Sequence, residues 1–189
     1  PAGRLFHDKD QPVLKPDAVV DIHAHFQLDA DDNVVPMRTT NLKNLSAEYL
    51  AEVKRRQAGY GEQSHLTRRL SEMDAAGIDY QLLSITHPIN DEWRTKNPGN
   101  DFCAKANDKV AEFVKRAPDR LGAWAKLDMI DVPGAIDELK RSVQELGLLG
   151  AFLITNFEVD APEMEPFYDA VEKLEVPIAL HGNLPGWIP

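Results

Sequence analysis

The chain has 189 residues, of which 43% are hydrophobic and 28% charged, so it can bury a core and is expected to form one domain over residues 1–189. Its 31 acidic residues outnumber its 21 basic ones and give a formal net charge of −10 at pH 7. A charge of this sign repels the phosphates of nucleic acids and anionic membrane surfaces. Composition therefore argues against nucleic-acid and membrane partners.

The cysteine content and the two ends of the sequence give further expectations. The single cysteine, Cys103, cannot form an intramolecular disulfide, and the sequence contains neither a long apolar run nor a charged-then-apolar leader. We therefore expect a cytoplasmic protein. The sequence starts at Pro1 and stops soon after an expected strand, so we expect the natural polypeptide to continue past Pro189.

The first half of the chain predicts two strands separated by a long connection and a helix. Residues 18–25 are rich in apolar and β-branched side chains, which is typical of a buried strand. A polar connection follows, in which Ser46 is suited to cap a short helix. Residues 66–76 have helical apolar spacing and are followed by Gly77, and residues 81–86 form the second expected strand.

The second half repeats this alternation. Three helices are expected, at residues 101–116, 133–146 and 163–175. Three strands are expected after them, at residues 121–127, 151–155 and 177–180. Strict alternation predicts an α/β fold with a parallel sheet covered on both faces. Periodicity does not choose between an open sheet and a closed barrel. No glycine-rich phosphate loop follows a strand, which disfavours a dinucleotide-binding fold.

The motif Asp21-Ile22-His23-Ala24-His25 lies at the carboxyl end of the first expected strand. Residues two apart on a strand point to the same face, so both imidazoles should converge, with Asp21 on that face one step earlier. Two neutral imidazoles are adjacent ligands for Zn²⁺ or a similar cation. The carboxyl ends of parallel strands also form the ligand face of such folds.

His181 directly follows the last expected strand and should face the same rim as the histidine pair. A third ligand from this position would leave one coordination position open for water or substrate, as a catalytic site requires. Each histidine also has an ordinary interpretation. His-x-His can be a hydrogen-bonded or surface pair, and a single strand-end histidine is often no ligand. Their matching positions at strand ends favour the metal interpretation.

Three further residues are candidates for substrate binding. His87 follows the second strand and could hold a carboxylate, Asn156 ends the fourth strand and could orient substrate through its amide, and Arg38 could clamp a substrate carboxylate. A loop histidine, a turn asparagine and a solvated arginine are the ordinary alternatives.

Six segments in combination carry a family resemblance that covers nearly the whole chain beyond residue 18 or so. They are DIHAH at 21–25, QLLS at 81–84, PDRLG at 118–122, ELKR at 138–141, ELG at 145–147 and PIALH at 177–181. Together they resemble the amino-terminal portion of the aminocarboxymuconate-semialdehyde decarboxylase-like branch of the amidohydrolase superfamily, also called amidohydrolase 2.

The resemblance implies a metal-dependent hydrolase-type TIM barrel, (β/α)8, of which this chain supplies about the first five β/α units. It also implies one divalent metal ion, most often zinc, held by His23, His25 and His181. The family's aspartate ligand on strand eight and its catalytic histidine after strand six would fall beyond this sequence, so the catalytic residues are unknown. Relatives often form dimers, which is compatible with a homo-oligomer.

Three functions remain open at this point. The resemblance implies a lyase that expels carbon dioxide without redox chemistry from a carboxylated unsaturated or aromatic small molecule. The same histidines could instead serve a hydrolase whose metal-activated water attacks a lactone, amide or ester. Alternatively, the chain is a non-catalytic piece that needs a partner, because five strands cannot close a barrel of eight.

Overall fold

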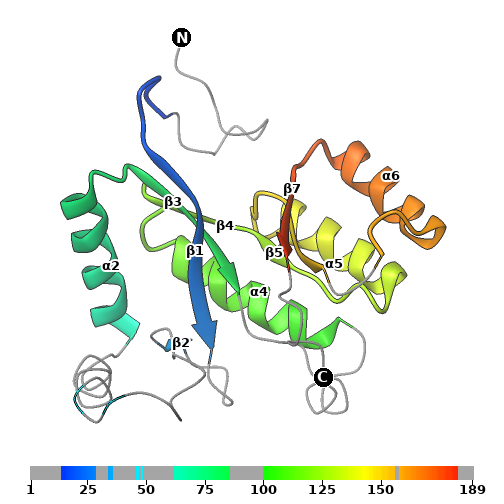
Figure 1. Cartoon of the computed structure of the whole chain (residues 1–189), viewed down its shortest axis with the longest axis horizontal. Coiled ribbons are helices and arrows are strands. Elements are labelled where there is room, and N and C mark those ends of the chain that lie inside the picture. Colours follow the sequence, from blue (N-terminus) through cyan, green and yellow to red (C-terminus); the bar gives the residue numbers. More distant parts are fainter. Residues whose placement is uncertain are drawn as a thin grey trace.

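In the computed structural model, residues 14–28, 34–35, 46, 48, 62–85, 100–155 and 158–182 are described. The strands are β1 (Val20–Leu28), β2 (Val34–Val35), β3 (Tyr80–Ile85), β4 (Leu121–Ala123), β5 (Ala125–Lys126), β6 (Ala151–Thr155) and β7 (Ile178–Gly182). The helices are α2 (Glu62–Ala76), α4 (Asp101–Val114), α5 (Val132–Gln144), the short 3₁₀ helix η2 (Pro162–Met164) and α6 (Glu165–Leu174). The expected alternation of strands and helices is confirmed (Figure 1).

The described strands form two open sheets, with strand orders β2-β1-β3-β4 and β5-β6-β7. All neighbouring strands run parallel except β1 and β2, which are antiparallel. The predicted α/β class with parallel strands is therefore confirmed. The described ranges do not form a closed barrel.

The strand expected over residues 121–127 is interrupted at Trp124, which divides it into β4 and β5. The interruption comes from Asn107 of α4. Its side-chain oxygen accepts from the Lys126 amide at 2.8 Å, and its side-chain nitrogen donates to the Lys126 carbonyl at 2.9 Å. These bonds replace the ladder to β3, while the Lys126 ammonium donates to the Ile85 carbonyl at 3.3 Å. The prediction of a single uninterrupted strand is therefore wrong. The Asn107 side chain, from a helix, makes the hydrogen bonds that the Lys126 backbone would otherwise make to a neighbouring strand.

Among the other elements expected in the described residues, the strand over 151–155 is confirmed with the same ends, and all but one of the rest are confirmed with shifted ends. The helix expected over residues 163–175 is divided into η2 and α6, and Glu175 ends it in the left-handed conformation with φ 53°. Pro166 at the start of α6 is suited to a first helical turn, where no backbone donor is needed. The short helix expected after Ser46 lies mostly outside the described residues.

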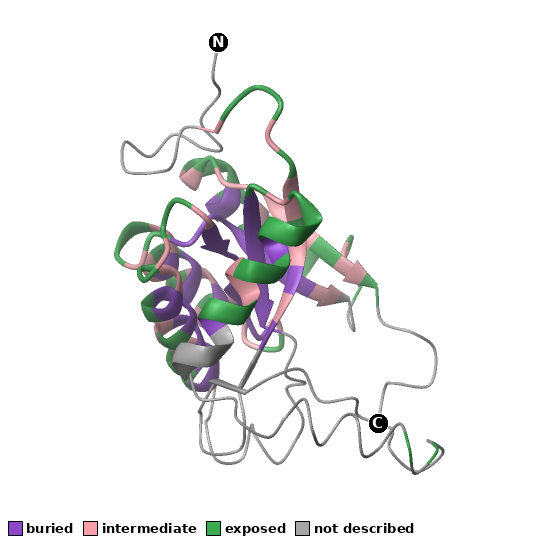
Figure 2. Cartoon of the chain, turned by 90° about the vertical axis from the view of Figure 1, so that its left-hand side faces the viewer, coloured by how far each residue is buried: buried purple, intermediate pink, exposed green. Residues whose placement is uncertain are grey.

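The two faces of the sheets bury different side chains. A large apolar cluster joins the outer faces of the strands, including Leu83 and Ile85, to the helices. A smaller cluster on the opposite face consists of Tyr80, Leu82, Trp124, Leu149 and Phe152. In Figure 2 the buried residues follow the strands and the helix surfaces turned toward them, and exposed residues cover the outer sides of the helices. The smaller cluster therefore lies on the sheet face that the described helices do not pack against.

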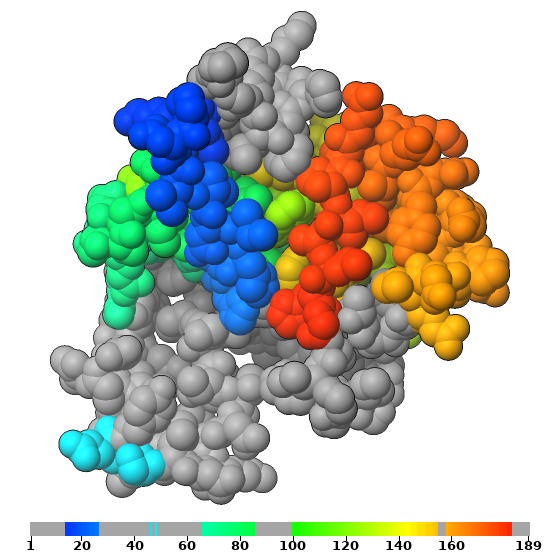
Figure 3. Space-filling model, turned by 45° about the horizontal axis from the view of Figure 1, so that its top comes forward, coloured from blue at the N-terminus to red at the C-terminus, as the bar shows by residue number. Residues whose placement is uncertain are grey.

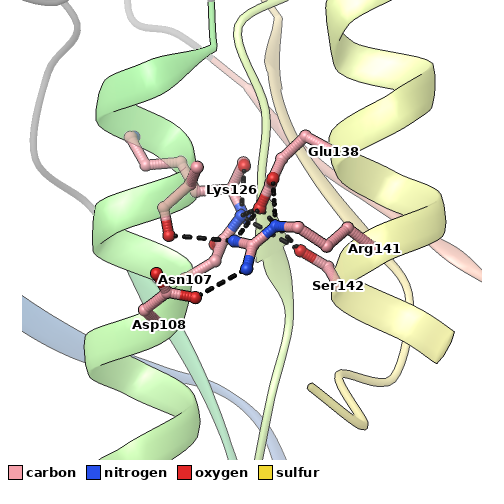
Figure 4. Close-up of polar contacts among 7 residues, drawn as sticks. Asn107, Asp108, Lys126, Glu138, Arg141 and Ser142 are labelled. Atoms are coloured by element: carbon pink, nitrogen blue, oxygen red, sulfur yellow. Dashed lines mark hydrogen bonds and ion pairs between the residues drawn. The ribbon is translucent and has the colours of Figure 1, made fainter. Parts of the chain in front are cut away.

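A buried polar cluster fixes α4 and α5 to β5 (Figure 4). Glu138, 6% exposed, accepts hydrogen bonds from Asn107 at 2.7 Å and from the Ser142 hydroxyl at 2.9 Å. Arg141 donates to Glu138 at 2.8 Å and to Asp108 at 2.7 Å. Because its buried carboxylate is hydrogen-bonded and ion-paired, Glu138 avoids most of the cost of burying a charge.

We predict that Asn107→Ala lowers the free energy of unfolding by about 2–4 kcal/mol, because it leaves the Lys126 amide and carbonyl buried without their partner. Denaturant unfolding of the two proteins measures the difference. Lys109→Ala, on the exposed side of the same helix, is the control and should change the value by no more than about 0.5 kcal/mol. Equal effects of the two substitutions would contradict this role of Asn107.

Candidate metal centre

The first strand contains a β-bulge at the start of the histidine motif. Asp21 pairs with Gln81 and Ala24 pairs with Leu83, so Ile22 and His23 share one position opposite Leu82. One extra residue on a strand reverses the alternation of side chains beyond it. The bulge therefore decides which residues of the motif share a face.

Asp21 does not share the face of the two histidines, and that expectation is wrong. The Asp21 carboxylate accepts a hydrogen bond from the Gln81 side chain at 2.9 Å, whereas the His23 ring contacts the Ser84 hydroxyl at 2.7 Å. Gln81 and Ser84 are three residues apart on β3, an odd spacing that places them on opposite faces of the sheet. Without the bulge, the period of two would have kept Asp21 beside His23.

On its own face, Asp21 belongs to a brace between β1 and α2. Arg69 of α2 donates to the Gln81 side-chain oxygen at 2.6 Å and to the His25 carbonyl at 2.7 Å. The Asp21 carboxylate also accepts from the backbone amide of His23 at 3.1 Å. These bonds hold the backbone of β1 on both sides of the bulge.

Trp124 supports the bulge from the other side of the sheet. Its indole N–H donates to the Ile22 carbonyl at 2.9 Å. The Trp124 side chain is 6% exposed and belongs to the smaller apolar cluster. A buried indole normally finds an acceptor for its N–H, and here that acceptor is a carbonyl within the bulge.

His23 and His25 have the geometry of two neighbouring ligands of one ion. Their Nε2 atoms are 3.1 Å apart, and their rings meet edge to face with centroids 4.9 Å apart. With metal–nitrogen bonds of about 2.0–2.1 Å, two nitrogens in adjacent tetrahedral or octahedral positions lie about 2.9–3.4 Å apart. The observed separation fits both arrangements, so the pair is suited to a divalent metal ion.

His181 approaches the pair from β7. It pairs with Ile154 of β6, and its ring centroid lies 5.2 Å from that of His23. The Phe152 ring is almost parallel to the His23 ring, at 8° and 5.4 Å, and also contacts His181 at 5.7 Å. Figure 3 shows β1 in blue and β7 in red on either side of an opening, with atoms of the intervening chain between them.

The three histidines do not yet form a closed set of ligands. Among the side chains that the structure describes, no group of three or more His, Cys, Asp or Glu is assembled closely enough to hold a metal ion. His23 and His25 are the pair whose ring nitrogens lie close together. His181 lies beside them, with its ring centroid 5.2 Å from that of His23.

The protonation of the pair suits metal binding. Burial, followed by the neighbouring His181, lowers the pKa of His23 below its usual 6.5, while Asp21 partly opposes this effect. Burial also lowers the pKa of His25, with smaller effects from His23, His181 and Arg69. Lowered pKa values keep both imidazoles neutral at pH 7, and a neutral imidazole is the form that binds a metal.

The remaining candidates for substrate binding fall outside the described residues; they are Arg38, His87 and Asn156. Cys103 is buried in α4. The structure also shows Ser84 and Phe152 against the His23 ring and Trp124 bonded to the neighbouring Ile22 carbonyl; none of these contacts was predicted from the sequence. Ser84 left one signal, since it is a polar residue inside a strand that is buried throughout.

Comparison with known proteins gives the family. A family model described as amidohydrolase matches residues 20–189. The chain belongs to the amidohydrolase family. The family resemblance drawn from the six sequence segments is therefore confirmed. No helix in the described part of this amidohydrolase is long and apolar enough to cross a membrane.

The curated relatives of this amidohydrolase include decarboxylases. Over 127 residues it is 37% identical to the gamma-resorcylate decarboxylase of Rhizobium radiobacter, an alignment that covers 62% of this chain and 38% of that protein. Over 116 residues it is 28% identical to the 2-amino-3-carboxymuconate-6-semialdehyde decarboxylase of Dictyostelium discoideum, covering 60% of this chain and 32% of that one. The aligned part thus spans well under half the length of each relative.

Solved structures similar to this chain also include decarboxylases. A dihydroxybenzoic acid decarboxylase from a Polaromonas species, with bound manganese and the inhibitor 2-nitroresorcinol, superposes on this amidohydrolase with a TM-score of 0.65. The two are 27% identical, and the match covers 89% of this chain and 50% of that one. The described fold of this amidohydrolase is therefore similar to about half of a metal-containing decarboxylase.

We predict that the metal-free protein loses stability as the pH falls below about 6.5. Because the pKa values of His23 and His25 are lowered in the folded state, the unfolded chain takes up protons in this range before the folded chain does. The contribution is complete above the unfolded value of 6.5 and is lost as the pH falls toward the folded pKa values. Urea unfolding of chelator-treated protein at a series of pH values measures it.

The control for the pH series is the double variant His23→Gln/His25→Gln, which lacks both titrating rings. Its free energy of unfolding should fall less over the same range, since only the carboxylates and other histidines still contribute. An identical pH dependence in the variant and the parent protein would show that the pair does not titrate as described.

We also predict that Trp124→Phe destabilises the protein by about 1–2 kcal/mol, because the Ile22 carbonyl loses its donor. Hydrogen exchange should then accelerate for backbone amides of β1. Tyr80→Phe is the matched control, since it removes a hydroxyl from the same cluster and leaves the bond from Trp124 to the Ile22 carbonyl in place. If the exchange of β1 amides is the same in both variants, Trp124 does not support the bulge.

Proposed function

We propose that the chain provides the first metal ligands of a metal-dependent carboxy-lyase, which removes carbon dioxide non-oxidatively from an aromatic or unsaturated carboxylate. The observation that carries the proposal is the pair of Nε2 atoms on β1, 3.1 Å apart. The relatives support the reaction class, since those described above are named as decarboxylases.

The proposed ligands are His23 and His25, joined by His181. When bound, a divalent ion at this place would supply Lewis-acid polarisation and a template for the substrate's oxygen atoms. Imidazole ligands accept zinc as well as manganese, so the donor set is compatible with zinc, which we retain as the predicted metal. Manganese is the metal named in the Polaromonas relative.

The other parts of the proposal concern the whole protein. We infer that the two sheets are part of a (β/α)8 barrel. Such a barrel repeats one unit, a parallel strand whose outer face is covered by a helix, and the described strands and helices follow this arrangement. A small-molecule carboxylate is the proposed substrate, with Arg38, His87 and Asn156 as its predicted contacts. A cytoplasmic location, one domain over residues 1–189 and assembly into a homo-oligomer also stay predictions.

The test uses the natural full-length polypeptide and the double variant His23→Ala/His25→Ala. We expect the parent protein to bind one divalent ion per subunit, and the double variant to retain none, because two adjacent ligands are removed. Metal content is measured by elemental analysis after gel filtration. His65→Ala, which replaces a histidine of α2, is the control and should keep its metal.

Activity is then followed by the release of carbon dioxide from hydroxylated benzoates such as 2,6-dihydroxybenzoate. Loss of carbon dioxide without oxidant supports a lyase, whereas addition of water to a lactone, amide or ester with no loss of carbon would support the hydrolase. Unchanged metal content in the double variant would reject the site itself.

A further inference from the structure

We propose that Ser84 is a positioning residue for metal binding: its hydroxyl holds His23 with the proton on Nδ1, so that Nε2 presents its lone pair beside that of His25. This inference rests on the proposed metal site. It concerns a residue of β3 that does not touch the ion, and it assigns a role to a hydroxyl inside a strand that is buried throughout.

Ser84 lies on β3, an interior strand of its sheet. β3 is buried along its whole length and pairs with β1 on one side and β4 on the other. Ser84 itself is fully buried and lies beside His25 in the register of the two strands. A buried hydroxyl cannot exchange its partners for water, so it holds the groups that it bonds to in one geometry.

Ser84 has one hydroxyl proton and two hydrogen-bonding neighbours, and these set the direction of the hydrogen bonds. The Ser84 oxygen is 2.7 Å from His23 Nδ1 and 3.3 Å from the Ala24 carbonyl oxygen. The carbonyl can only accept, so a hydroxyl that donates to it has no proton left for the imidazole. The oxygen then accepts from Nδ1–H, which is the tautomer that leaves Nε2 free to bind a metal.

The opposite arrangement is the one that the metal site must avoid. If Ser84 donated to Nδ1, the ring proton of neutral His23 would be on Nε2, directed at His25 across the 3.1 Å contact. Such a proton would occupy the place of the ion. The Ala24 carbonyl therefore matters as much as the hydroxyl, since it gives the hydroxyl proton another acceptor.

The ring is also held in orientation. Phe152 lies nearly parallel to one face of the His23 ring, while Ser84 holds its Nδ1 edge. Rotation of the imidazole about its Cβ–Cγ bond would break the Ser84 contact and the stacking together. Stacking on Phe152 fixes the plane of the His23 ring, and the hydrogen bond to Ser84 fixes which edge of the ring faces β3.

The experiment compares Ser84→Ala with Ser84→Thr and with Ser142→Ala in the natural full-length protein, using Zn²⁺ as the probe. Affinity is measured by competition with a chromophoric chelator. We expect Ser84→Ala to weaken Zn²⁺ binding by about 10–100-fold, and the threonine hydroxyl to restore most of it. Ser142 is also fully buried but bonds to Glu138 and Asn107, so Ser142→Ala should leave Zn²⁺ affinity unchanged.

A second readout reports the tautomer directly. In protein labelled with ¹⁵N-histidine and loaded with Zn²⁺, we expect the His23 Nδ1 proton to be observed and slow to exchange, and to be lost or fast in Ser84→Ala. Thermal unfolding of each metal-free variant shows whether the substitution has merely weakened the fold.

The outcomes separate the two proposals. A parent protein that binds no Zn²⁺ would overturn the proposed function, and with it this inference. A parent protein that binds Zn²⁺ while Ser84→Ala binds it equally well would overturn the role of Ser84 alone. Equal loss of affinity in Ser84→Ala and Ser142→Ala would also overturn it, because a general loss of stability would then explain both.

Discussion

The β-bulge at Ile22 and His23 is the constraint on which the rest of the site depends. It turns His23 and His25 to the face that carries Ser84 and Phe152, and turns Asp21 to the face of Gln81 and Arg69. One strand thereby serves two purposes. Its inner face presents imidazoles, and its outer face is tied to a helix by a chain of charged and amide groups.

Polar groups recur at the places where regular pairing stops. Asn107 completes the backbone of Lys126 where β5 leaves β3, and the Trp124 indole completes the carbonyl of Ile22 at the bulge. Each polar side chain takes a backbone bond that a regular ladder would have made, as buried backbone groups require. The strand break lies between β4 and β5, whereas the bulge lies on β1 within the histidine motif. The second of these departures from ideal geometry therefore coincides with the candidate site.

The candidate site combines parts that are far apart in sequence. His23 and His181 belong to β1 and β7, yet their ring centroids are 5.2 Å apart, with Phe152 of β6 against both. The two strands belong to different sheets, so the contact joins the inner faces of both. The lowered pKa values of His23 and His25 keep this pair in the neutral form that the proposed metal site requires.

The sequence by itself determined the alternation of strands and helices, the α/β class and the two histidines two residues apart, because periodicity and strand-end position are local properties. It also singled out His181. Only the tertiary structure decided that Asp21 faces away from the two histidines, that the strand expected over residues 121–127 is divided at Trp124, and that Ser84 contacts His23. A bulge and a helix side chain that replaces strand pairing depend on contacts between distant segments, and these leave no period in the sequence.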